Sequence, residues 1–137
     1  MANSSSLLFP KSSRQFPGQR WINISLRTLH LIGLSGTGAG FLSNNPQINW
    51  KAFLLLTIIS GTSMMLISIW SNGIWLLQLR GQTILLKLAL LSLILLQPKY
   101  HAELFILVII LSGLISHAPG NTRYYSIFYG RRIDTVP

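Results

Sequence analysis

Residues 51–70 read KAFLLLTIISGTSMMLISIW, an apolar run whose only charged residue is Lys51 at its first position. At about 1.5 Å per residue, a helix of this length spans about 30 Å, the thickness of the hydrocarbon core of a bilayer. Trp50 and Trp70 flank the run, as aromatic residues do at the level of the lipid headgroups. The stretch therefore predicts a transmembrane helix over residues 51–70.

The composition of the whole chain agrees with a membrane environment. Hydrophobic residues make up 50% of the 137 residues and charged residues only 9%, whereas soluble domains carry about 25% charged residues. The chain has no cysteine, which excludes disulfides, thiolate metal sites, iron–sulfur clusters and covalent c-type haem. Its two acids, Glu103 and Asp134, are far apart in sequence, so paired-carboxylate catalysis is not expected. We expect an all-α integral membrane protein that is not an enzyme, or at most a redox subunit.

Three more apolar stretches extend the prediction to a bundle of four transmembrane helices over residues 21–118. Asn and Pro residues within 43–47, and Pro98, separate neighbouring stretches. The third stretch is the shortest, which leaves open whether it crosses fully. It contains Lys87, whose side chain we expect to snorkel toward the surface that carries Arg80. The predicted spans cover residues 22–42, 51–70, 83–97 and 100–117.

Basic residues set the predicted orientation. The chain has 11 Lys and Arg against 2 acids, a formal net charge of +9, and no nucleic-acid-binding motif accompanies this excess, so we expect no nucleic-acid partner. Lys and Arg residues are enriched in cytoplasmic loops, and only Lys51 and Lys99 fall on the opposite side. Both termini are therefore predicted to be cytoplasmic, in a protein of the cytoplasmic (inner) membrane. The basic residues on the cytoplasmic side are Lys11, Arg14, Arg20, Arg27, Arg80, Arg123, Arg131 and Arg132.

The segments outside the spans have distinct compositions. Residues 1–20 are polar and Ser-rich and are interpreted as a flexible cytoplasmic arm; a secretory signal peptide is the competing interpretation, with a very short apolar core. The connection 71–82 is expected to lie in the membrane interface. Residues 119–137 mix aromatic rings with arginines, which predicts an interfacial tail that lies on lipid, including anionic headgroups, or docks on a partner. The residues predicted at the interface are Trp21, Trp50, Trp70, Tyr100, Arg123, Tyr124 and Tyr125.

Glycines mark the faces on which helices are expected to pack. Gly36 and Gly40 have GxxxG spacing in the first span, and Gly33 lies on nearly the same face. Without a side chain, a neighbouring helix approaches closely and gains dispersion contacts. Gly61 in the second span and Gly113 in the fourth are predicted to act in the same way. We favour packing within the chain over a dimer contact.

His30 is the residue of the first span with the clearest chemical potential. Ionisable groups inside a membrane are costly and usually have a partner or a task. Arg27 lies one turn earlier on the same helix face, and His117, near the exit of the fourth span, is predicted on the same side of the membrane. His30 and His117 as axial ligands, with Arg27 pairing a propionate, would fit a b-type haem; Arg27 and His30 alone would fit a quinone or proton relay.

Plainer interpretations exist for every histidine. His30 would equally form a hydrogen bond with a Ser or Thr of a neighbouring helix. His117 precedes Ala-Pro-Gly and would cap the last carbonyls of its helix. His101 and Glu103, on the opposite side, are interpreted as a solvated pair, so no metal site is predicted.

The pattern Arg27-x-x-His30-x-x-Gly33 at the start of a membrane helix resembles small b-type cytochrome and membrane-anchor subunits, such as succinate dehydrogenase anchors. The resemblance covers one helix and implies haem b or a quinone at Arg27 and His30. We expect a small accessory or anchor subunit of a larger bioenergetic membrane complex, which acts by helix packing and by contacts with lipids and other membrane subunits. The alternative is an electron-transfer subunit that binds haem b or a quinone.

Overall fold

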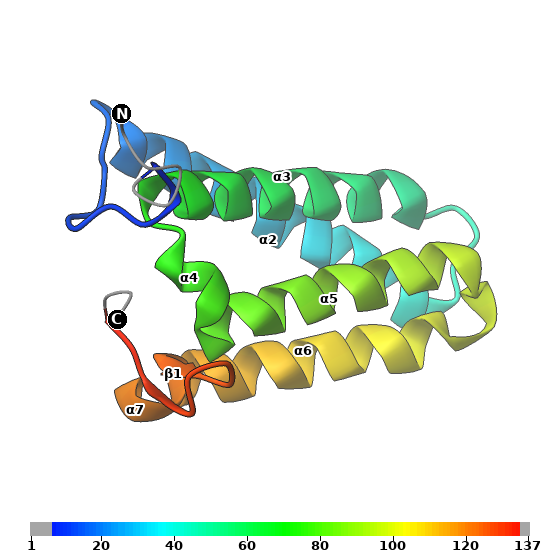
Figure 1. Cartoon of the computed structure of the whole chain (residues 1–137). Coiled ribbons are helices and arrows are strands. Elements are labelled where there is room, and N and C mark those ends of the chain that lie inside the picture. Colours follow the sequence, from blue (N-terminus) through cyan, green and yellow to red (C-terminus); the bar gives the residue numbers. More distant parts are fainter. Residues whose placement is uncertain (1–6, 135–137) are drawn as a thin grey trace.

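The computed structural model describes residues 7–134 and is mostly helical. Its long helices run alongside one another, and neighbours in space point in opposite directions (Figure 1). They form two hairpins, α2 with α3 and α5 with α6. The bounds are α2 (Gln19–Ser43), α3 (Trp50–Ser71), α5 (Leu79–Leu96) and α6 (His101–His117).

Within the described residues, three segments are long and apolar enough to cross a membrane: Trp50–Ser71, Leu79–Leu96 and Pro98–His117. The predicted first span, residues 22–42, lies in α2. This helix is the longest, with 25 residues, but it carries Arg20, Arg27 and many Gly, Ser and Thr residues, so it is less apolar than the other three. The chain is therefore a helical protein with three candidate membrane-spanning helices.

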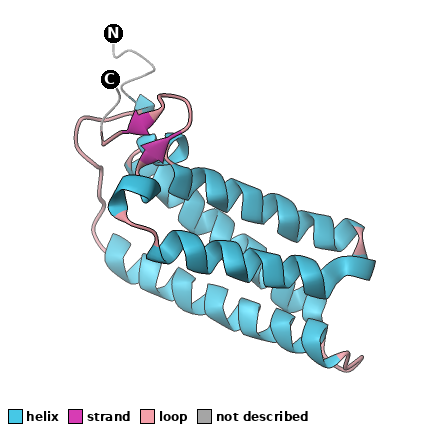
Figure 2. Ribbon diagram, turned by 90° about the horizontal axis from the view of Figure 1, so that it is seen from below, coloured by secondary structure: helices cyan, strands magenta, loops and turns pink. Residues whose placement is uncertain are grey.

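Short elements connect and extend the long helices. Most of them gather at the end of the bundle where the chain begins and ends, and the two strands form a small hairpin there (Figures 1 and 2). Their bounds are α4 (Ile74–Leu77), the 3-10 helix η1 (Pro98–Tyr100), α7 (Gly120–Arg123), β1 (Tyr125–Ser126) and β2 (Arg131–Arg132).

The α2–α3 hairpin is held together at the predicted glycine face. A Cβ atom added to Gly33 would lie 2.8 Å from the backbone nitrogen of Thr57 and 2.9 Å from the carbonyl oxygen of Phe53. A Cβ atom on Gly36 would collide with the Phe53 ring, and Gly40 is similarly confined. Only hydrogen fits at these positions, so the glycines allow the two helix backbones to approach each other closely.

An apolar cluster joins the two hairpins at the opposite end from the termini. Phe41 of α2 meets Phe105 of α6 edge to face, with ring centroids 5.5 Å apart, a favourable arrangement for aromatic rings. All four long helices contribute to the cluster, which consists of Phe41, Leu54, Leu91, Ile94, Phe105 and Val108. These side chains are almost fully buried and form the main core.

The connection between α3 and α5, which is predicted to lie in the membrane interface, is largely buried within the protein. Its helix α4 buries Ile74 and Trp75, and the Gln78 side chain is only 2% exposed. Gly81 makes this possible, since a Cβ atom there would lie 2.9 Å from the carbonyl carbon of Trp75. The apolar residues of the connection therefore pack against the rest of the protein.

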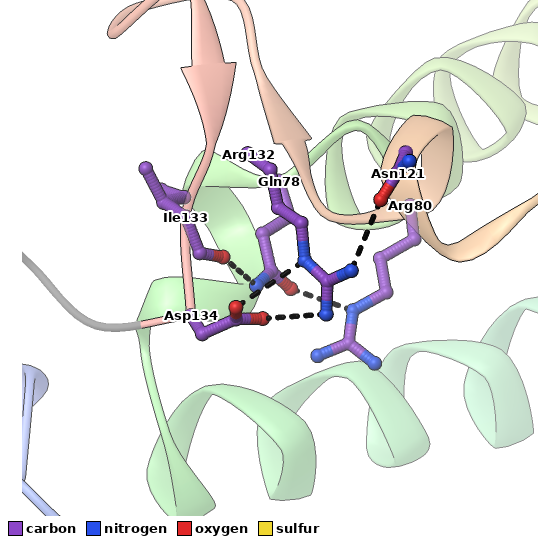
Figure 3. A network of polar contacts seen from close by, with 6 residues as sticks. All are labelled: Gln78, Arg80, Asn121, Arg132, Ile133 and Asp134. Carbon is purple, nitrogen blue, oxygen red and sulfur yellow. Dashed lines mark hydrogen bonds and ion pairs between the residues drawn. The ribbon is translucent and has the colours of Figure 1, made fainter.

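The C-terminal tail folds back onto the chain itself. The Gln78 side-chain amide donates a hydrogen bond of 2.8 Å to the backbone oxygen of Ile133 (Figure 3), and the Ile133 side chain is buried. Strands β1 and β2 pair in antiparallel register, and Arg132 forms an ion pair of 3.2 Å with Asp134. The predicted tail of residues 119–137 thus has a docking site on α4 and α5; residues 135–137 lie outside the described part.

The N-terminal segment also contacts the bundle. Of the predicted arm, residues 1–6 lie outside the described part. The Arg14 backbone nitrogen donates to the Ser71 carbonyl oxygen at 2.9 Å, and the Ser71 hydroxyl donates to the Arg14 carbonyl oxygen at 2.7 Å. The Gly73 nitrogen donates to the Leu8 oxygen at 2.8 Å. The start of α2 is thereby placed beside the end of α3.

The outer surface of the bundle is strongly apolar. Large side chains point outward along every long helix, and Leu114 of α6, for example, is 66% exposed. A soluble monomer rarely leaves a large continuous apolar surface uncovered. The exposed residues include Leu31, Ile59, Leu66, Leu86, Ile110 and Leu114.

Candidate functional site

His30 is anchored to the neighbouring helix α3. Its Nδ1 atom lies 3.0 Å from the carbonyl oxygen of Thr57 and 3.2 Å from the hydroxyl oxygen of Ser60. A carbonyl oxygen only accepts, so Nδ1 carries the proton and donates. The Ser60 hydroxyl donates to the Leu56 carbonyl oxygen at 2.7 Å and is left to accept from His30. The second ring nitrogen, Nε2, remains available to another group.

Gly61 makes room for the imidazole ring. A Cβ atom added there would lie 3.1 Å from Cε1 of His30 and 3.3 Å from Nδ1, closer than most real contacts of that kind. The predicted packing glycine of the second span therefore lies against His30 itself. Gly113 differs from the other predicted packing glycines, because an added Cβ atom would meet nothing within 4 Å in the described structure.

A cavity of about 500 Å³ lies between the two hairpins, and His30 is in its wall. Arg27 of α2 lines the same cavity, so the structure brings together the pair singled out in the sequence. Arg27 also lines a second, polar hollow with Arg20 and Asn23. It is an exposed residue shared by the two spaces, and so it lies at the mouth of the interhelical cavity.

Lys87 is a member of this site that was not among the candidate site residues predicted from the sequence. Its ammonium group donates to the Ser112 hydroxyl of α6 at 3.1 Å, and both residues line the cavity. The Lys87 side chain thus contacts α6 inside the bundle, and its snorkelling toward the surface that carries Arg80 stays a prediction. A lysine within an apolar span is itself the signal that could have found the site, since such residues usually face a bundle interior or a cavity.

The other two histidines lie apart from His30. His117 is exposed at the end of α6 and is not among the residues that line the cavity. His101 lies at the opposite end of the bundle, where its ring is 4.6 Å from that of Phe41 and stacks on Trp50. Within residues 7–134, no group of three or more His, Cys, Asp or Glu residues is placed to hold a metal ion.

The residues predicted at the membrane interface differ in how far other parts of the protein cover them. Tyr124 is surrounded by cations, with the guanidinium carbons of Arg80, Arg132 and Arg123 at 4.6, 5.2 and 5.8 Å from its ring centroid. Trp50 packs against Phe41 in the aromatic cluster. The remaining ones have exposed rings at the ends of helices or in the tail: Trp21, Trp70, Tyr100 and Tyr125.

Comparisons of the chain with protein-family models, with curated proteins and with solved structures find no match. The class of protein is therefore described here from the fold and the cavity alone. This class is a small helical protein with three candidate membrane-spanning helices and a basic interhelical cavity.

Proposed function

We propose that this chain is a small accessory or anchor subunit of a larger bioenergetic membrane complex. It lies in the cytoplasmic membrane with four spans, α2 included, and both termini in the cytoplasm. It acts through helix packing and through contacts with lipids and other membrane subunits, and it is not an enzyme by itself.

The contact between Arg14 and Ser71 supports the proposal that α2, the predicted first span, crosses the membrane as the other three helices do. These residues precede α2 and end α3, and they are joined by two hydrogen bonds of 2.9 and 2.7 Å. Because α2 runs antiparallel to α3 along its length (Figure 1), we infer that α2 crosses the same bilayer as α3. The low apolar content of α2 fits its closely packed glycine face.

The distribution of basic residues supports the orientation. Arg80, Arg123 and Arg132 meet around Tyr124 at the end of the bundle that holds both termini. At the other end of the bundle, the basic residues of the described chain are only Lys51, at the start of α3, and Lys99, in η1. Since Lys and Arg mark the cytoplasmic side, the end with the termini is assigned to the cytoplasm.

The uncovered surface of α6 is the observation that carries the subunit proposal. Only Phe105 and Val108 of this 17-residue helix are buried within the chain. Gly113 faces open space beside the exposed Leu114. Glycines of this kind often allow a neighbouring helix to approach closely, but no helix of the described chain packs on Gly113. A helix from another subunit fits this face.

Purification of the tagged full-length chain from its native membranes in a mild detergent tests the proposal. We expect a particle much larger than the 15.3 kDa chain, with other membrane proteins at constant ratio through size exclusion. Gly113→Leu should release these proteins while the chain stays folded, and Thr122→Leu, at an exposed position of α7, serves as a substitution outside this helix. Elution as a lone monomer from native membranes would contradict the proposal.

A second candidate is an electron-transfer subunit that binds haem b or a quinone. The shared cavity of Arg27 and His30 favours it, and the unused Nε2 atom of His30 would serve either group. Because His117 does not line the cavity, a quinone fits these residues better than a haem with two histidine ligands. An intact purified complex with a Soret band that His30→Ala abolishes would favour haem; unchanged turnover after this substitution would favour a structural role.

A further inference from the structure

The interhelical cavity contains more positive charge than the pair Arg27 and His30 supplies. Lys87 projects into the same space from the other hairpin. The chain has only two carboxylates, and neither Glu103 nor Asp134 is among the described residues that line the cavity. Within residues 7–134, the lining of the cavity thus places no carboxylate beside the basic side chains of Arg27 and Lys87.

Such an arrangement is costly inside a membrane. Lys and Arg residues in spans normally pair with a carboxylate, a carbonyl oxygen or a ligand. Lys87 has one neutral partner, the Ser112 hydroxyl at 3.1 Å, whereas an ammonium group has three donors. A bound anion would compensate the charge of Lys87 and Arg27 together.

The rest of the cavity wall is mostly apolar, with Ser68 as a further polar residue. Met64 and Met65 of α3 and Leu88 and Leu91 of α5 line it, and methionine side chains adapt readily to flexible ligands. The volume of about 500 Å³ lies within the range of about 300–1,000 Å³ that is typical of small-molecule sites. The site thus has a cationic part and an oily part, and Arg27 lies at its mouth.

We propose that this cavity binds a single-chain amphiphile with an anionic head, a carboxylate or a phosphate ester. The head lies between Lys87 and Arg27, beside Nε2 of His30, and the acyl chain lies along the methionine and leucine side chains. This inference stands whether or not the chain is a subunit of a complex. It selects an anionic ligand over a neutral quinone, because a neutral head leaves both cations uncompensated.

Binding measurements on the purified full-length chain in phosphatidylcholine nanodiscs test the proposal. The probes are a fluorescent long-chain fatty acid, lysophosphatidic acid, the long-chain alcohol of equal length and a short-tailed ubiquinone. We expect saturable binding of one fatty acid or one lysophosphatidic acid per chain, and the stronger of the two identifies the head. The alcohol and the ubiquinone should not displace the bound probe.

Matched variants assign the binding to the cavity. Lys87→Met keeps the side-chain length and should weaken binding about ten- to a hundredfold, the loss expected for a charge-assisted contact. Lys87→Arg should retain most of it, and Lys51→Met, at the far end of the bundle, should have no effect. Melting curves of the ligand-free variants identify any that fail to fold, and Arg27→Gln then replaces Lys87→Met. Displacement by the alcohol or the ubiquinone, equal affinity of the folded Lys87→Met or Arg27→Gln variant, or no saturable binding would overturn the proposal.

Discussion

The two ends of this bundle are built from the same four helices, yet they differ in character. At the end away from the termini, Phe41, Leu54 and Ile94 are at most 2% exposed and join the hairpins in a dry core. At the other end, the hairpins enclose a cavity lined by Arg27 and Lys87. Close packing stabilises the first end, whereas the second contains a cavity with two basic side chains in its wall.

The short helix α4 contributes to this difference. It follows α3 and precedes α5, and its residue Trp75 lines the cavity. The opposite end has no such inserted helix in the described structure, because the turn over residues 44–49 and η1 lead directly from one long helix to the next. The inserted helix at one end and the direct turns at the other are consistent with the position of the cavity of Arg27 and Lys87 at the α4 end.

The largest loss of stability is expected from a substitution in the apolar cluster at the end away from the termini. Phe41→Ala removes the ring that contacts Trp50 and Phe105 and should cost about 3 kcal/mol, at the lower end of the usual range for such substitutions, because lipid also covers apolar groups in the unfolded state. Denaturation of the purified protein, followed by circular dichroism, measures this loss. The exposed Leu114→Ala is the control; equal losses for both variants would mean that the cluster is not the core.

A smaller loss is expected from the glycine face of α2. Gly33→Ala places a methyl group 2.8 Å from the backbone nitrogen of Thr57, and overpacking of this kind costs about 1–3 kcal/mol. Gly113→Ala adds the same methyl group where nothing lies within 4 Å and should change the stability of the isolated chain by less than about 0.5 kcal/mol. The same denaturation assay ranks the pair, and a reversed order would refute the assigned packing of α2 on α3.

The smallest effect on global stability is expected at the open end. Gln78→Ala removes the hydrogen bonds of 2.8 Å to Ile133 and 2.7 Å to Arg80, each worth about 1 kcal/mol. The loss should be local, because the tail detaches from α4 and α5 while the dry core persists. Limited proteolysis should cleave the tail of this variant faster. An unchanged cleavage rate would show that the tail is held by other contacts.

The sequence predicts the long helices well and their contacts poorly. Apolar runs and the breaks at Asn45, Pro46 and Pro98 lie within one segment at a time, so they locate the helices without reference to the rest of the chain. The contact between Gln78 and Ile133 joins residues 55 positions apart. Nothing in the local pattern distinguishes this docking site from a lipid surface.

The candidate site shows the same division. The spacing of Arg27 and His30 on one helix is visible in the sequence, and so is the unusual Lys87 in an apolar span. Their convergence on one cavity depends on how the hairpins pack, which local patterns do not specify. His117 illustrates the converse, because a shared side of the membrane does not place two histidines in one site.

The central claim is that the two ends of the bundle face opposite sides of a membrane, with the cavity nearer the cytoplasm. Because the chain has no cysteine, single substitutions can be labelled without background. With a membrane-impermeant maleimide on intact cells, Gln47→Cys should be labelled, whereas Ser12→Cys and Thr122→Cys should be labelled only after permeabilisation. Equal labelling of Ser12→Cys and Gln47→Cys on intact cells would contradict the crossing of α2 and with it the four-span bundle.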